Sequence, residues 1–131
     1  MFKWGGTLKE TVLWTNPDST VNFAAQNVTL SDSISNYDYI KIKYRGTPLV
    51  DYYSSAIIEV SELKKLLDGT TRGEFTVFMG VASYYQNTYS LGRGVSYVND
   101  TTLHFRTGQY IGASGTSAGY AIPTQIIGLK Y

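Results

Sequence analysis

The stretch Ile40-Lys41-Ile42-Lys43-Tyr44-Arg45 alternates between apolar and cationic side chains. A β-strand turns successive side chains to opposite faces of its sheet, so this period of two predicts a strand with one apolar and one cationic face. We expect the apolar face to join a core. We interpret the cationic row as a solvated face that guards a sheet edge against aggregation, in preference to a contact for phosphate or an acidic polymer.

The same alternation elsewhere in the chain predicts an all-β protein. It is clear in Leu103–Arg106 and Phe75–Gly80. Weaker strand candidates, bounded by Gly, Pro, Asn or Asp, are Thr7–Trp14, Asn27–Leu30, Ser55–Val60, Gly94–Tyr97 and Tyr120–Tyr131. Roughly eight strands result, a number typical of sandwiches and jelly rolls. We therefore expect an antiparallel β-sandwich that is jelly-roll-like.

One short helix is expected within this β-rich chain. Ser61 is a candidate N-cap for a helix over Glu62–Leu67, and Gly69 lies just beyond it as a stop signal. The small residues of Gly112–Gly119 predict a loop that joins two strands.

Length and charge indicate one soluble domain over residues 1–131. The chain is 43% hydrophobic and 16% charged, which suits a packed core. Its formal net charge of +1 gives no overall field toward nucleic acid or an anionic membrane. It has no cysteine, and no segment approaches the roughly 20 apolar residues of a membrane helix. We expect neither nucleic-acid binding nor membrane insertion.

Catalytic chemistry finds little support in the sequence. His104 is the only histidine and falls on the polar face of a predicted strand, which disfavours a catalytic triad and excludes a His-rich metal site. Carboxylates for glycoside hydrolysis are present, but no pattern fixes their separation. The glycines of Gly112–Gly119 lack the Lys-Ser or Lys-Thr pair of a phosphate-binding loop. We therefore expect a non-enzymatic protein without cofactor or metal.

Tyrosine is frequent, with 12 in the chain, and two pairs are adjacent: Tyr52-Tyr53 and Tyr84-Tyr85. Neighbours on a strand face opposite ways, so one ring of each pair is expected to be exposed or at an interface. Burial in the core remains the alternative for any single tyrosine.

A ligand surface is predicted where tyrosines and amides cluster. This segment follows a strand ending near Val81 and precedes a predicted turn at Gly92-Arg93-Gly94, and loops at sandwich ends commonly carry recognition. Aromatic faces beside amide groups suit a neutral sugar. The candidate ligand-binding residues are Tyr84, Tyr85, Gln86, Asn87 and Tyr89.

The two ends of the chain carry recognisable segments, Leu13–Pro17, Phe23–Gln26 and Asn36–Ile40 at the start and Tyr120–Lys130 at the end. They resemble the β-sandwich domains found near the ends of phage tail or head fibre proteins. The opening segments are similar to domains in structural proteins of phages that infect Gram-positive and gut bacteria. The ending is similar to the closing strand of those domains. The middle of the chain, Leu49–Gly119, adds little to the resemblance.

The resemblance implies a virion fibre or appendage domain, made in the cytoplasm of the bacterial host and often trimeric. It supplies no binding residues. One hypothesis is a receptor-binding tip that holds a bacterial surface polysaccharide on tyrosine rings. The other is a purely structural module that closes a homotrimer. A glycan hydrolase is a third alternative, without an acid/base pair to support it.

Overall fold

The computed structural model describes residues 7–47, 50–66, 75–84, 87–110 and 116–131. Only the backbone is described at residues 47, 50–52, 75–84, 87–91, 109–110 and 116.

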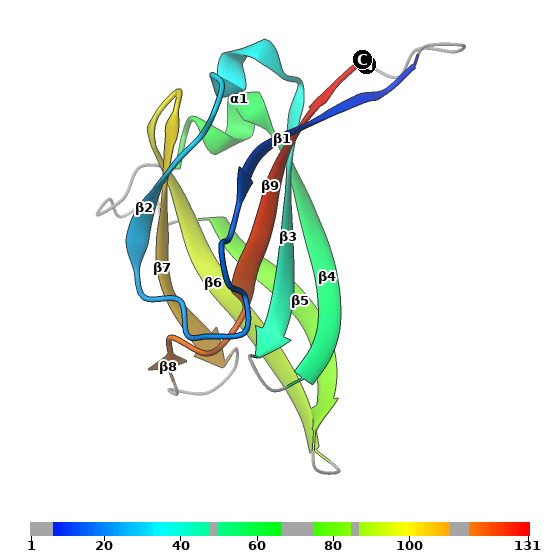
Figure 1. Ribbon diagram of the computed structural model, residues 1–131, viewed down its shortest axis with the longest axis vertical. Coiled ribbons are helices and arrows are strands. Elements are labelled where there is room, and N and C mark those ends of the chain that lie inside the picture. Colours follow the sequence, from blue (N-terminus) through cyan, green and yellow to red (C-terminus); the bar gives the residue numbers. More distant parts are fainter. Residues whose placement is uncertain (1–6, 48–49, 67–74, 85–86, 111–115) are drawn as a thin grey trace.

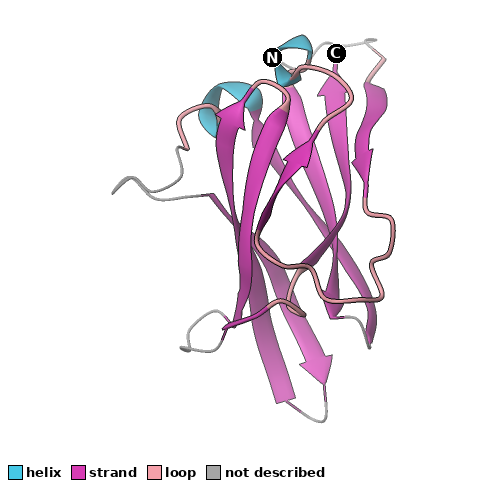
Figure 2. Cartoon of the chain, turned by 60° about the vertical axis from the view of Figure 1, so that its left-hand side comes forward, coloured by secondary structure: helices cyan, strands magenta, loops and turns pink. Residues whose placement is uncertain are grey.

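Within these residues, nine strands form two antiparallel sheets that pack against each other (Figure 1). Sheet A has the order β1 (Lys9–Thr15), β9 (Ile122–Lys130), β3 (Tyr39–Thr47) and β4 (Val50–Glu59). Sheet B has the order β2 (Gln26–Thr29), β7 (Thr102–Tyr110), β6 (Asn87–Asn99) and β5 (Phe75–Tyr84), with β8 (Thr116–Ser117) paired to β7. The expected all-β antiparallel sandwich is confirmed, and Figure 2 shows its two layers.

The chain crosses between the sheets four times. It passes from sheet A to sheet B and back through β1, β2 and β3, from sheet A to sheet B again between β4 and β5, and back to sheet A before β9. These crossings are jelly-roll-like, whereas β3 and β4 are neighbours in sheet A, and β5, β6 and β7 are neighbours in sheet B. Part of the predicted loop Gly112–Gly119 is a strand, because Thr116 and Ser117 pair with β7.

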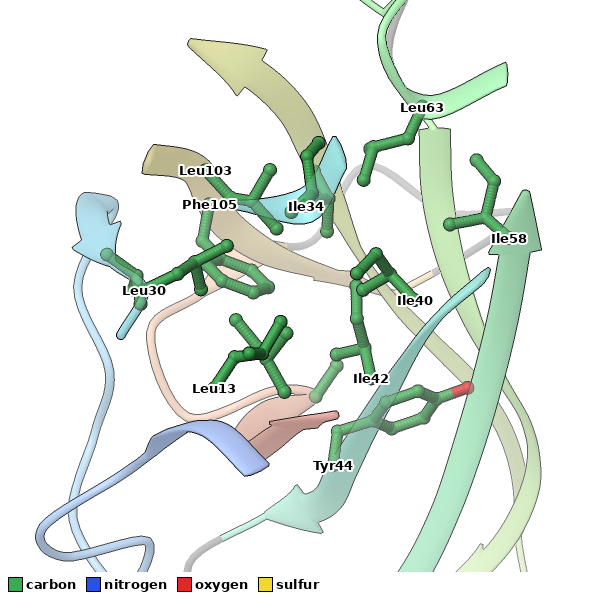
Figure 3. Close-up of a cluster of buried hydrophobic side chains, with 14 of the residues drawn as sticks. Leu13, Leu30, Ile34, Ile40, Ile42, Tyr44, Ile58, Leu63, Leu103 and Phe105 are labelled. Carbon is green, nitrogen blue, oxygen red and sulfur yellow. The ribbon is translucent and has the colours of Figure 1, made fainter. Parts of the chain in front are cut away.

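The inner face of β3 builds the core as its alternation predicts. Ile40, Ile42 and Tyr44 are at most 1% exposed and point toward the other sheet (Figure 3). Sheet B contributes Leu103 and Phe105 to the same core, and both side chains are buried. Burial of each such side chain contributes about 1.5–3 kcal/mol, so this apolar layer holds the sheets together.

The cationic face of β3 differs from its prediction. β3 lies between β9 and β4, so it does not guard an edge of the sheet. Lys43 is exposed and Lys41 is half-buried, but Arg45 is only 8% exposed. Arg45 is covered because its guanidinium lies over the ring of Tyr53, 5.7 Å from the ring centre.

Two helical turns close one end of the sandwich. They are η1 (Ile34–Asn36) and α1 (Val60–Leu63), and Ile34 and Leu63 are fully buried. The predicted N-cap Ser61 is wrong, because the helix begins at Val60, two residues before the predicted start at Glu62, where the Val60 amide donates to the Asp38 carbonyl. The predicted end at Leu67 is also wrong, because the helix ends at Leu63 and Lys64 and Lys65 form a turn, while Leu67 and Gly69 themselves lie outside the described residues.

The predicted turn at Gly92-Arg93-Gly94 is also wrong, because these residues lie inside β6. Arg93 is paired with Val77 of β5 and Gly108 of β7 and is 1% exposed. Its guanidinium donates hydrogen bonds of 2.7–3.1 Å to the carbonyl oxygens of Phe23, Arg106, Ala118, Tyr120 and Ala121. A single side chain thus fastens sheet B to the segments before β2 and before β9.

Candidate functional site

The tyrosine and amide cluster predicted to bind ligand lies at the end of the β5–β6 hairpin, which extends past the neighbouring strands (Figure 1). Tyr84 pairs with Asn87, and Tyr89 pairs with Ala82, so these residues stand on strands and not on a loop. β5 reaches Tyr84 because the pairing continues past a register shift between Phe78 and Val81.

The remaining two members of that predicted site, Tyr85 and Gln86, lie outside the described residues. The side chains of Tyr84, Asn87 and Tyr89 are not described either. This site therefore stays a prediction from the sequence.

The other adjacent tyrosine pair supplies an exposed ring. Tyr53 is 58% exposed on the outer face of sheet A, as expected for one member of a pair on a strand. The side chain of Tyr52 is not described. An exposed aromatic ring of this size is the first element of a binding surface.

A pocket of about 430 Å³ lies beside this ring, and we call it the Tyr53 pocket. Its volume falls within the range of roughly 300–1,000 Å³ found for small-molecule sites. Hydroxyl and amide side chains dominate its wall, with one amine and one aromatic ring. The lining residues are Thr15, Asn16, Ser19, Lys43, Tyr53, Ser54, Thr124 and Gln125.

The pocket forms where the end of β1 meets an irregularity in β9. Lys43 pairs with Gln125 and Tyr44 with Pro123, so Thr124 is an additional residue on β9. Such a bulge bends a strand and redirects its side chains. The Asn16 amides hold the bulge, because the backbone N–H donates to the Thr124 carbonyl (2.9 Å) and Nδ2 to the Pro123 carbonyl (2.8 Å).

Several polar groups of the pocket are available to a ligand. The hydroxyls of Ser19, Thr124 and Tyr53 make no hydrogen bond within the described part of the chain. Gln125 makes one long bond of 3.4 Å, from Nε2 to the Thr15 hydroxyl, which leaves its carbonyl oxygen free to accept. The pocket therefore offers donors and acceptors beside an aromatic face.

Among the described lining residues, Lys43 carries the charge of the pocket. Lys43 is exposed and has no ion pair among the residues that the structure describes. Asp18, next in sequence to Ser19, has a lowered pKa, chiefly because the Thr20 side chain and backbone N–H donate to its carboxylate, and the Arg45 charge adds to the effect. No carboxylate is among the described residues that line the pocket.

A second pocket of about 460 Å³ lies between η1, the start of β3 and α1. Two of its charged groups, Lys64 and Asp38, already have partners. Lys64 lies 3.4 Å from the Asp100 carboxylate and donates to the Ser35 hydroxyl. Asp38 lies 3.6 Å from Lys130 and accepts from the Tyr131 N–H. These contacts join elements of the fold, so this pocket is the weaker candidate.

His104 lies on β7, where Nδ1 is 2.7 Å from the Asn27 amide oxygen, a contact between β7 and β2. In the described parts of the chain, there is no cluster of three or more His, Cys, Asp or Glu side chains that could hold a metal ion. No helix among those residues is long and apolar enough to cross a membrane.

No protein-family model matches the chain, and no curated protein matches it in sequence. The functional argument therefore rests on the residues and their geometry. Sequence reasoning singled out Tyr53 but not Thr124 or Gln125 as its neighbours. The register of β9 against β3 brings them together, and no local pattern encodes that register.

Proposed function

We propose that this chain is a non-enzymatic domain of a phage virion fibre and that it binds a bacterial surface polysaccharide in the Tyr53 pocket. The observation that carries this proposal is an exposed tyrosine ring beside hydroxyl groups that have no hydrogen-bond partner among the described residues and beside the Gln125 amide, whose oxygen is free to accept. Sugars present both an apolar C–H face and a rim of hydroxyls, so this combination suits them.

The arrangement of the ring supports the proposal. Arg45 lies over Tyr53 and is itself nearly buried, so the ring is held by the protein before any ligand arrives. A ring that is already ordered loses less conformational entropy on binding, which favours affinity. The bulge at Thr124 and the side chain of Gln125 then supply hydrogen-bonding groups from the neighbouring strand.

The assignment to a virion fibre rests on the resemblance of the opening and closing segments. In the fold these segments are adjacent, because Asn16 of the first binds Pro123 and Thr124 of the second. The proposal includes the homotrimer that the resemblance implies. It also includes a location in the virion after synthesis in the host cytoplasm.

Binding of purified bacterial polysaccharides by wild type and Tyr53→Ala tests the site. We expect wild type to bind at least one polysaccharide, and Tyr53→Ala to lose about 1 kcal/mol or more of binding energy, roughly fivefold or more in Kd. The melting temperature should change little, because Tyr53 is 58% exposed.

Val98→Ala is the matched control, since Val98 is 45% exposed on β6 and lies outside the pocket and outside sheet A. It should bind as wild type does. Equal binding by Tyr53→Ala and wild type would refute this site, and so would the absence of binding to every polysaccharide offered. Release of cleaved sugar products would instead indicate a hydrolase.

Exposed apolar side chains favour the second candidate, a structural module that closes the trimer. Val12 and Ile57 are 49% and 55% exposed, and both lie in one row across the outer face of sheet A with Ile127 and Lys41. Such a row is suited to contact a second copy of the chain. Sedimentation of wild type and Val12→Asp tests this candidate. We expect wild type to sediment as a trimer and Val12→Asp as a smaller species. If Val12→Asp still binds glycan, trimer contact and glycan binding are separate roles of the chain.

A further inference from the structure

We propose that the Tyr53 pocket selects a polysaccharide repeat that bears an acidic group, a carboxylate or a phosphate, and that Lys43 binds this group. The inference rests on the proposed glycan-binding function and specifies its ligand class. It departs from the neutral sugar expected from the sequence, where the charge of the chain as a whole is balanced.

The amine of Lys43 is the group in the pocket that favours an acidic ligand over a neutral one. Lys64, Lys65 and Lys130 each lie within 3.6 Å of a carboxylate of the protein. Lys43 has no such partner within the described residues, although it lies in a pocket wall. The three N–H donors of Lys43 therefore belong to a site whose described lining residues include no acidic side chain.

The neighbouring cation cannot serve the ligand in the same way. Arg45 lies against the Tyr53 ring and close enough to Asp18 for its charge to lower the pKa of that carboxyl. Its charge is thus partly balanced within the protein. Lys43 remains the cation of the pocket that is free to meet an anion.

Strand pairing places Lys43 at a suitable distance from the ring. Lys43 is opposite Ser55, and Arg45 is opposite Tyr53, so Lys43 and Tyr53 are diagonal neighbours on the outer face. Diagonal neighbours of an antiparallel pair lie roughly 7–8 Å apart at Cα. A sugar stacked on Tyr53 can therefore direct a ring substituent toward the Lys43 amine.

The protein has a net charge of only +1, so the contact between Lys43 and an acidic glycan group acts at short range. No long-range field attracts polyanions to the protein, so preference for an acidic glycan requires a direct contact. Because Lys43 is exposed, salt will screen the contact, and the preference is expected to weaken as ionic strength rises.

The test offers bacterial surface polysaccharides in three forms: untreated, carboxyl-reduced, and dephosphorylated with hydrofluoric acid. We expect wild type to bind an acidic polysaccharide about tenfold more tightly than its neutralised form. The treatment that removes binding identifies the anion as carboxylate or phosphate. Lys43→Gln should bind the untreated and neutralised forms equally.

Lys41→Gln is the matched control, because Lys41 lies on the same face of β3 two residues away and outside the pocket. It should keep the preference for the acidic form. If neutralised polysaccharides bind as tightly as untreated ones and Tyr53→Ala still abolishes binding, the acidic preference is refuted and the glycan-binding function stands. If Lys43→Gln keeps the preference, Lys43 is not its origin. If no form binds, the proposed function fails.

Discussion

At the scale of single residues, Arg93 shows how a buried charge is made tolerable. Burial lowers its pKa to about 10, so the guanidinium stays charged at neutral pH. Its acceptors are five backbone carbonyls, which provide partial negative charge in a fixed arrangement. The planar guanidinium can reach them all, and the ring of Phe23 covers it at 5.3 Å.

Arg93→Lys and Arg93→Met are both expected to destabilise the fold by more than about 3 kcal/mol. Lysine keeps the charge but has three donors at one point, so it leaves carbonyls without partners. Methionine removes every donor. Chemical denaturation measures the loss, with Lys43→Met as an exposed control that should stay within about 0.5 kcal/mol of wild type. A loss below about 1 kcal/mol for Arg93→Met would show that these bonds contribute little.

The same residue shows why sequence patterns mislead locally. Gly92-Arg93-Gly94 combines flexible and charged residues, which is typical of a turn. In the fold the two glycines flank a residue that is buried at the centre of β6. Arginine is seldom fully buried, and carbonyls that are distant in sequence, those of Phe23, Ala118, Tyr120 and Ala121, help to make its position favourable.

At the scale of elements, Asp100 connects the β6–β7 turn to both helical turns. Its carboxylate accepts hydrogen bonds from the hydroxyls of Tyr97 (2.6 Å) and Ser35 (2.8 Å) and lies 3.4 Å from Lys64. Its carbonyl accepts from the Ile34 N–H. The bond from Tyr97, followed by that from Ser35 and the charge of Lys64, lowers the pKa of Asp100.

Asp100→Asn is expected to lower the melting temperature near pH 7 and to have a smaller effect in acid. A carboxyl whose folded-state pKa is lowered stabilises the protein above its unfolded value of about 3.9. That stability is lost as the pH falls through the lower folded value. Thermal unfolding of both proteins at pH 7, 5 and 3 checks this. A difference in melting temperature that stays constant from pH 7 to pH 3 would contradict it.

The sequence predicted the positions of the strands better than the way in which the strands pair. Alternation and turn residues located all eight expected strands, because each strand carries its own apolar face. The bulge at Thr124 and the start of α1 at Val60 escaped prediction, since each depends on a contact with a residue far away in sequence. The Tyr53 pocket escaped for the same reason, because its wall comes from four separate segments.

At the scale of the whole molecule, the last strand in sequence is central in space. β9 lies between β1 and β3, and β2 pairs with β7 across most of the chain. Trp14 of β1 packs with its ring centre 5.9 Å from that of Phe23 and 6.5 Å from that of Phe105 of sheet B. The environment of Trp14 therefore depends on both sheets being in place.

These distant pairings predict slow folding, in milliseconds to seconds, because loop closure must precede the contacts that stabilise the sheets. The variant Trp4→Phe leaves Trp14 as the only tryptophan, so stopped-flow fluorescence after dilution from denaturant reports when the two sheets meet. We expect a single slow phase for Trp14 that coincides with recovery of the β signal in circular dichroism, since sheet A lacks its central strand until β9 pairs. Val98→Ala, an exposed position in β6, should leave the rate unchanged. Folding within microseconds, or a Trp14 signal complete well before the β signal, would show that the core forms without β9.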